Sequence, residues 1–111
     1  MTNEERRIEQ LKRRLAKLGP MLPGSISEQW NVCGTPGCRC KDPEKPVKHG
    51  PYYQISFTVG GKSSTMFVKR ADLSEARRRL KSYQQFKTLS TELVHAYIAL
   101  ARKSGFQRRP S

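Results

Sequence analysis

Apolar residues recur at helical spacing at the start of the chain, with gaps of 3, 4 and 3 positions. This spacing predicts an amphipathic helix over residues 1–19, with an apolar seam of the kind found in coiled coils. Thr2 and Glu5 have the spacing of a capping box, and Gly19-Pro20 ends the pattern. A lone helix of this length is marginally stable, so the seam must pack on the chain's own long helix or on a second copy. The seam residues are Ile8, Leu11, Leu15 and Leu18.

Residues 52–69 alternate between apolar and polar positions on both sides of Gly60-Gly61. This pattern predicts a two-stranded antiparallel hairpin closed by a two-residue turn. The turn fixes a register that pairs Val59 with Lys62, Phe57 with Ser64, Ile55 with Met66 and Tyr53 with Val68. The face expected to meet a core carries Tyr53, Ile55, Phe57, Met66 and Val68. The other face is polar with two aromatics, and carries Tyr52, Gln54, Ser56, Thr58, Ser63, Thr65, Phe67 and Lys69.

A longer stretch of helical periodicity predicts a helix over residues 72–104. Asp72 and Glu75 have the spacing of an N-cap and its third-position partner, and no glycine or proline follows before Gly105. Three arginines and a lysine crowd the first turns, where the helix dipole disfavours cations, so these charges are expected to serve a partner. The expected apolar stripe consists of Leu80, Tyr83, Phe86, Leu89, Leu93, Tyr97 and Leu100.

Between these patterned regions, residues 19–51 hold six of the seven prolines and five of the eight glycines. This composition argues against a long helix or a continuous sheet and predicts a loop over residues 20–51. The expected fold is therefore α+β, with an N-terminal helix, a loop, a two-stranded hairpin and a long C-terminal helix. Residues 1–105 are expected to form a single small domain, followed by a disordered tail over residues 106–111.

The chain of 111 residues is only 35% hydrophobic and carries 22 Lys and Arg against 9 Asp and Glu, a formal net charge of +13. So small an apolar fraction predicts a small core that needs a metal or a partner to stabilise it. The sequence has no apolar run long enough for a membrane span and no secretory signal, so a cytoplasmic location is expected. The excess charge predicts a polyanionic partner, most simply DNA or RNA.

Three cysteines and a histidine in the loop have the spacing C-x4-C-x-C-x8-H, formed by Cys33, Cys38, Cys40 and His49. Three thiolates and one imidazole are a common tetrahedral ligand set for Zn²⁺, and four protein ligands leave no open position for a substrate. We therefore expect a structural zinc ion that ties the loop to the hairpin, giving a zinc-stapled loop. The single residue between Cys38 and Cys40 is shorter than the usual spacer of about two to four residues.

Other interpretations of the cysteines remain open at this point. The odd number of cysteines in a chain without a secretory signal argues against disulfides, but free thiols and redox chemistry are both alternatives. If His49 is not a ligand, water would complete a three-cysteine site, and a zinc enzyme becomes an alternative. The sequence shows no recognisable nucleophile or carboxylate metal motif, so the protein is expected not to be an enzyme.

Four short motifs together carry a resemblance. They are Pro23-Gly24-Ser25-Ile26-Ser27, Cys33-Gly34-Thr35-Pro36-Gly37-Cys38-Arg39-Cys40, His49-Gly50-Pro51-Tyr52-Tyr53 and Gly60-Gly61-Lys62. Over roughly residues 20–85 the chain resembles a family of short prokaryotic proteins of unknown function, some of them found beside mobile elements. The resemblance implies a cysteine block, a hairpin and a charged helix, and it brings no established reaction.

The sequence thus predicts a small, basic, zinc-stapled protein that binds nucleic acid and assists a larger nucleic-acid enzyme or ribonucleoprotein. Tyr52 and Phe67 would stack on bases of a single strand, unless they pack under the loop or against the long helix. The alternative is a protein-interaction module that forms a homodimer through its helices or docks on a protein partner. The cations expected to contact phosphates are Arg39, Lys41, Lys45, Lys48, Lys62, Lys69, Arg70, Arg77, Arg78, Arg79 and Lys81.

Overall fold

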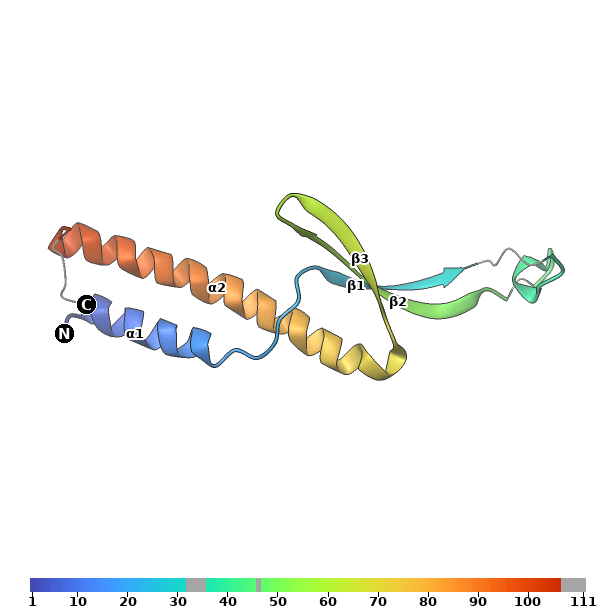
Figure 1. Ribbon diagram of the computed structural model, residues 1–111, viewed down its shortest axis with the longest axis horizontal. Coiled ribbons are helices and arrows are strands. Elements are labelled where there is room, and N and C mark those ends of the chain that lie inside the picture. The colour runs from blue at the N-terminus through green and yellow to red at the C-terminus, as the bar shows by residue number, and fades with distance from the viewer. Residues whose placement is uncertain (32–35, 46, 107–111) are drawn as a thin grey trace. The chain divides into compact units, whose positions relative to one another are not determined.

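The computed structural model describes residues 1–31, 36–45 and 47–106. Within these residues the fold is α+β, with two α-helices and one three-stranded antiparallel sheet (Figure 1), which confirms the expected fold class. No helix in this part of the chain is both long enough and apolar enough to cross a membrane. The elements in chain order are α1 (Asn3–Ala16), β1 (Ser25–Asn31), a 3-10 turn (Arg39–Lys41), β2 (His49–Val59), β3 (Lys62–Val68), a second 3-10 turn (Arg70–Asp72) and α2 (Leu73–Ser104).

Residue contacts divide the chain into two compact units. The helical unit comprises Met1–Met21 and Lys81–Ser111, and the sheet unit comprises Leu22–Leu80. Helix α2 supplies its first turns to the sheet unit and its remainder to the helical unit. The expectation that residues 1–105 form a single domain stays a prediction. Of the tail predicted to be disordered, Phe106 is exposed, and residues 107–111 lie outside the described residues.

Helix α1 begins where its capping residues predict. The Thr2 hydroxyl accepts a hydrogen bond from the Glu5 backbone N–H at 3.2 Å, which satisfies one of the free donors of the first turn. At the other end, the Lys17 backbone N–H donates to the carbonyl groups of Arg14 and Leu15. The helix ends at Ala16, slightly before the expected boundary at residue 19.

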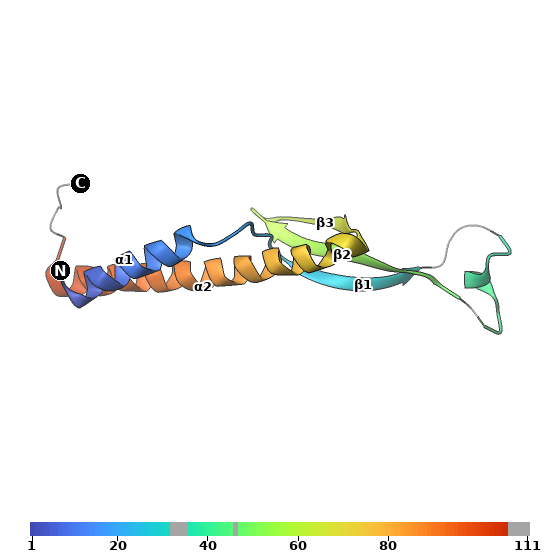
Figure 2. The ribbon, with the colours of Figure 1, turned by 90° about the horizontal axis from the view of Figure 1, so that it is seen from below.

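Within the helical unit, α1 lies lengthwise along α2 (Figures 1 and 2). Ile8 and Leu11 form a buried cluster with Leu89 and Ala96, and Leu11 is 0% exposed. The chain's own long helix therefore covers the seam of α1, which decides between the two packing partners that the sequence left open. The partly buried residues around this cluster are Leu15, Leu18, Leu93 and Leu100.

The buried face of α2 is narrower than the predicted stripe. Leu89 is buried, but Phe86 and Tyr97 are exposed, and Ala96, which the prediction omitted, is buried. The physical reason is that α1 covers one face of α2, so the positions beside that face remain in solvent. Phe86 stacks on Tyr83 instead, with a distance of 6.4 Å between ring centroids.

Helix α2 begins at Leu73, directly after Asp72, the residue predicted as its N-cap. Glu75 departs from the predicted capping pattern, because its carboxylate pairs with Arg78 at 3.2 Å and with Arg79 at 3.4 Å. Two of the arginines expected to serve a partner are therefore already paired within the first turns of the helix.

The sheet unit is built on the predicted hairpin. Strands β2 and β3 pair in the expected register, from Val59 with Lys62 to Tyr53 with Val68. A third strand, β1, pairs antiparallel with the other edge of β2, giving the strand order β1-β2-β3. This strand corrects the prediction of a loop over all of residues 20–51. Residues 25–31 contain neither proline nor glycine, and the composition of the longer segment hid this short strand.

The two faces of the sheet differ as the alternation predicts. On the apolar face Ile55 is 1% exposed and Tyr53, Phe57 and Val68 are half-buried, although Met66 remains exposed. Strand β1 extends the polar face, because its residues alternate in step with those of β2. On that face Ser25 lies opposite Ser56, Ser27 opposite Gln54 and Gln29 opposite Tyr52.

Candidate metal centre

The candidate ligands come from two neighbouring segments of the sheet unit. Cys38 precedes the 3-10 turn Arg39–Lys41, Cys40 lies within it, and His49 is the first residue of β2. The Lys41 backbone N–H donates to the Cys38 carbonyl at 3.0 Å and closes the turn around the two cysteines. This turn explains how a single intervening residue suffices, because the chain reverses between Cys38 and Cys40 instead of running extended.

The side chains of Cys38, Cys40 and His49 lie close enough to hold one metal ion. Their ligand atoms all lie within 4.8 Å of one another, and 3.1 Å separates Cys38 Sγ from His49 Nε2. Ligands in tetrahedral coordination around a single zinc ion lie about 3.5 to 3.8 Å apart, given the usual metal–ligand bond lengths. The distance from Cys38 Sγ to His49 Nε2 is shorter than this range, and the two sulfurs and the imidazole nitrogen lie close enough together to hold one metal ion. Cys33, the remaining predicted ligand, lies outside the described residues.

Burial distinguishes the three ligands. Cys40 is 2% exposed, whereas Cys38 and His49 are half-buried. The segment around Cys40 has few apolar side chains to cover the buried thiol, because most of the neighbouring side chains are exposed. An ion bound by these three side chains would supply the cohesion that an apolar core supplies elsewhere.

Short hydrogen bonds shape the segment between the ligands. Asp42 Oδ1 accepts from the backbone N–H of Glu44 at 2.9 Å and from that of Lys45 at 3.3 Å, which caps a tight turn. The Val47 backbone N–H donates to the Arg39 carbonyl at 2.9 Å and returns the chain toward β2. These bonds bring His49 back beside the cysteines.

Gly50 fixes the backbone next to His49. It has a φ of +147°, and a Cβ added to it would lie 2.8 Å from the Gln29 carbonyl oxygen and 3.1 Å from the Trp30 ring. Here two residues of β2 lie opposite one of β1, because His49 pairs with Asn31 and Tyr52 with Gln29. The glycine that follows the histidine in the His49-Gly50-Pro51 motif is therefore required by close approach of the neighbouring strand.

Trp30 lies beside the candidate ligands, although no sequence motif assigns it a role there. Its ring covers Gly50, and yet the side chain is 51% exposed. Its place at the end of a strand was hidden because that strand was itself missed. The available signal is weak, because Ile26 and Trp30 share one face of the strand with the polar residue Glu28 between them.

The predicted phosphate-contacting cations do not gather in one cluster. Arg39, Lys41, Lys45 and Lys48 lie around the metal centre, whereas Lys62 follows the turn at the far end of β2. Strand β2 has 11 residues, a length of about 35 Å, so these groups are separated by most of the hairpin. Arg78 and Arg79 pair with Glu75, and the other predicted cations form no ion pair with any described residue.

The two predicted stacking residues do lie on one surface. Phe67 is 79% exposed and pairs with Gln54, two positions along β2 from Tyr52, which is 43% exposed. Neither side chain is buried under the described part of the cysteine loop or against α2, the alternative that the sequence left open. The surface around them is hydroxyl- and amide-rich, and the Ser27 hydroxyl donates to the Gln54 carbonyl at 3.4 Å.

Comparison with known proteins identifies a family for the chain. No curated protein and no solved structure matches it. The family match covers residues 1–78, which include α1, the whole sheet and the start of α2. It therefore begins earlier than the range of the expected resemblance, and it contains every candidate metal ligand. The chain belongs to the family described as a domain of unknown function, DUF6788.

Proposed function

We propose that this protein is a zinc-binding, nucleic-acid-binding accessory protein. Its sheet unit would hold single-stranded nucleic acid on the polar face of the sheet. The observation that carries the proposal is the exposure of Phe67 and Tyr52 on that face. Large aromatic side chains left in water gain by stacking on nucleic-acid bases, worth about 1 to 3 kcal/mol per base. The register makes the two residues diagonal neighbours on β2 and β3, so both rings are within reach of successive bases of one strand.

Charge supports the same partner. The sheet unit carries ten basic residues against five acidic ones, a net charge of +5. Lys69 and Arg70 directly follow β3, close in sequence to Phe67, and both are exposed. Cations beside stacking aromatics can neutralise the phosphates that link the stacked bases, which gives affinity without sequence selection.

The role proposed for zinc is structural. Cys38, Cys40 and His49, completed by Cys33, would give the ion four protein ligands and leave no position for a substrate. The ion would fix the loop against the start of β2 and so hold the strand that carries Tyr52. On this proposal the protein performs no reaction itself and assists a larger nucleic-acid enzyme or ribonucleoprotein.

Binding of a fluorescent single-stranded oligonucleotide, measured by anisotropy, tests the proposal. Phe67→Ala is expected to weaken binding about tenfold, because it removes one stacking surface. Phe106→Ala is the matched control, since Phe106 is also exposed but lies in the helical unit. Equal affinities of the two variants, or an affinity that does not change with salt concentration, would contradict the proposal. Parallel titrations with DNA and RNA strands distinguish the two partners.

The metal is tested separately. Native mass spectrometry of the protein purified without chelator is expected to show one zinc ion per chain. The same spectrum reports the number of subunits and any nucleic acid that co-purifies. A metal-free chain would contradict the zinc assignment while leaving the stacking proposal to the binding assay.

A second candidate is a protein-interaction module, which the uncovered side of α2 favours. Phe86, Val94, Tyr97 and Ile98 are exposed along this helix. The α1 seam packs on α2 in the apolar cluster, which favours the exposed side of α2 over the seam as a dimer surface. Sedimentation equilibrium of a Val94→Lys/Ile98→Lys variant is expected to show a loss of self-association if α2 mediates a dimer, and an unchanged monomer if it does not.

A further inference from the structure

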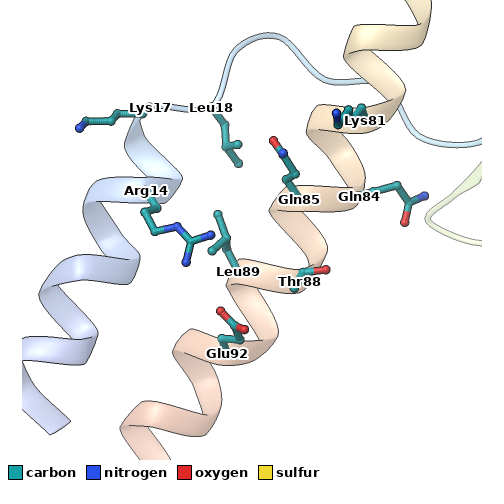
Figure 3. Close-up of a pocket in the computed structure, with 9 residues that line it drawn as sticks. All are labelled: Arg14, Lys17, Leu18, Lys81, Gln84, Gln85, Thr88, Leu89 and Glu92. Atoms are coloured by element: carbon teal, nitrogen blue, oxygen red, sulfur yellow. The ribbon is translucent and has the colours of Figure 1, made fainter. Parts of the chain in front are cut away.

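A groove in the helical unit lies between the end of α1 and residues 81–92 of α2 (Figure 3). Its volume is about 540 Å³. Arg14 and Lys17 line it from the α1 side, and Lys81 lines it from α2. In Figure 3 the Arg14 side chain reaches from α1 toward α2, whereas Lys17 extends outward at the rim. Both helices thus contribute cations to one concave surface.

The three cations of the groove outnumber its one carboxylate. Arg14, Lys17 and Lys81 form no ion pair with any residue that the structure describes. The acidic residue of the lining, Glu92, is already paired with Arg7 at 3.3 Å. Arg14 and Lys17 lie where cations complement the C-terminal end of the α1 dipole, but this explanation does not extend to Lys81 in the interior of α2.

The other lining residues provide apolar and hydrogen-bonding groups, which suit a ligand larger than a single anion. Leu18 and Leu89 provide an apolar floor, and Leu18 and Gln85 point into the space between the helices (Figure 3). Gln84, Gln85 and Thr88 add neutral hydrogen-bonding groups along one side. Amide side chains can both donate and accept, which matches the mixed edges of a nucleic-acid base, while cations match its phosphate.

We infer that this groove binds a phosphodiester together with its base in a single-stranded nucleic acid. The inference rests on the proposed function and adds to it a second contact region, built by the helical unit and separate in sequence from the sheet surface. The α2 side of the groove lies beyond residues 1–78 of the family match, so this surface is not defined by that match.

Two other hollows within the described residues are less suited to binding a phosphate. The hollow of about 340 Å³ in the sheet unit is lined by Asp72 and Glu75 as well as by Arg79, which pairs with Glu75. The hollow of about 180 Å³ near the start of α1 contains Glu9 between its arginines. The groove also has a carboxylate, that of Glu92, but three cations line it, whereas the hollow in the sheet unit has two carboxylates against one cation.

The salt dependence of binding tests the groove. An Arg14→Gln/Lys81→Gln variant is titrated with a labelled single-stranded oligonucleotide of about 15 nucleotides at several salt concentrations. Each phosphate contact contributes about 0.7 to the slope of log K against log salt, so the slope is expected to fall by about 1.4. The control is Arg13→Gln/Lys87→Gln, which removes the same charge from the same two helices outside the groove lining. Arg13 also shares with Arg14 the last turn of α1.

The possible outcomes separate this inference from the proposed function. An equal fall of the slope in both double variants, or no fall in the groove variant while Phe67→Ala still weakens binding, overturns the groove and leaves the proposed function standing. A wild-type protein that binds without salt dependence overturns both. Circular dichroism checks that the variants keep their helix content.

A second measurement needs no variant. On addition of unlabelled oligonucleotide, the side-chain amide NMR signals of Gln84 and Gln85 are expected to shift. Shifts confined to the sheet unit would overturn the groove. Inorganic phosphate added at the same ionic strength should leave these signals in place, and shifts of equal size with phosphate alone would overturn the nucleic-acid assignment in favour of a free-anion site.

Discussion

The backbone at Gly50 combines two restrictions that act on the same residue. Its φ of +147° is rarely adopted by residues with a side chain, and an added Cβ would meet both the Gln29 carbonyl and the Trp30 ring. Gly60 provides the comparison, since it has a φ of +60° and no atom within 4 Å of the same added Cβ. The two glycines therefore separate the cost of backbone conformation from that of steric overlap.

Gly50→Ala is expected to lower the free energy of unfolding by about 3 kcal/mol, because strain and overlap act together. Gly60→Ala is expected to cost only about 1 to 2 kcal/mol, the price of the left-handed conformation alone. Urea denaturation of both variants measures the difference. An equal loss in the two variants would show that the β1 backbone and Trp30 can move away from position 50 without cost.

Cys40 is the most buried of the described ligands, so its replacement tests the metal centre most directly. Losing a group that only hydrogen-bonds to a ligand lowers metal affinity about 10- to 100-fold, so Cys40→Ser is expected to lower zinc affinity by at least about 100-fold. Competition with a zinc-binding dye measures this affinity. Arg39→Gln, a change at the neighbouring exposed residue of the same turn, should retain zinc. Undiminished affinity in Cys40→Ser would remove Cys40 from the ligand set.

At the scale of elements, the pairing of α1 with α2 includes a pH-sensitive contact. A backbone hydrogen bond in the first turn of α1, and then hydrogen bonding and charge attraction from Lys103, hold the pKa of Glu4 below its usual value. Lys103 Nζ lies 3.4 Å from Glu4 Oε2. Because the folded state favours the ionised carboxyl, the backbone hydrogen bond and the Lys103 contact together stabilise the protein above the usual pKa, and this stabilisation is lost as the pH falls through the lowered value.

Glu4→Gln is therefore expected to have a lower thermal midpoint than the wild type near neutral pH. The gap should close as the pH falls through roughly pH 5 to 3, where glutamates protonate. Thermal unfolding followed by circular dichroism across this range measures it. Glu9→Gln is the control within the same helix, since its partner Lys12 lies at the longer distance of 4.0 Å. A gap of constant size at every pH would contradict the ionic origin of the contact.

The elements also show which parts of the fold sequence patterns can predict. The hairpin register was predicted residue by residue, because a two-residue turn and period-two alternation leave a single consistent pairing. Strand β1 was missed because it is short and its partner β2 is distant in sequence, so only tertiary pairing defines it. The predicted stripe on α2 is wider than the buried face for a related reason. Periodicity marks apolar residues, whereas the covering helix decides that Ala96 is buried and Phe86 is not.

For the candidate site, chemistry was more predictable than position. The residue types and spacing of Cys38, Cys40 and His49 predict that their side chains lie together, because few residue types bind zinc. The structure brings these three side chains together. For the cations, the sequence predicts the total positive charge but not where it gathers, since any exposed Lys or Arg adds the same charge whatever its location. The structure separates Lys41 from Lys62 by the length of β2. It also identifies Arg14 and Lys17, which no sequence motif singles out.

At the scale of the whole molecule, the two units differ in what stabilises them. The helical unit has an apolar cluster around Leu11 and Leu89, and no candidate ligand lies in its described residues. The sheet unit has few buried residues, and one of them, Cys40, is a candidate ligand. Removal of metal is therefore expected to destabilise the sheet unit and to leave the stability of the helical unit unchanged.

Hydrogen exchange with and without a chelator tests this inequality. The Lys41 backbone N–H donates to the Cys38 carbonyl at 3.0 Å. The backbone N–H groups of Asp42 and Val47 donate to the Arg39 carbonyl at 3.2 and 2.9 Å. Without metal their exchange is expected to accelerate about tenfold or more, because the turn opens locally. The amides of Leu11 and Leu89 should keep their rates, since apolar packing protects them. Equal acceleration in both units would mean that the metal stabilises the chain as one cooperative body, and unchanged exchange in the turn would mean that its hydrogen bonds hold it without metal.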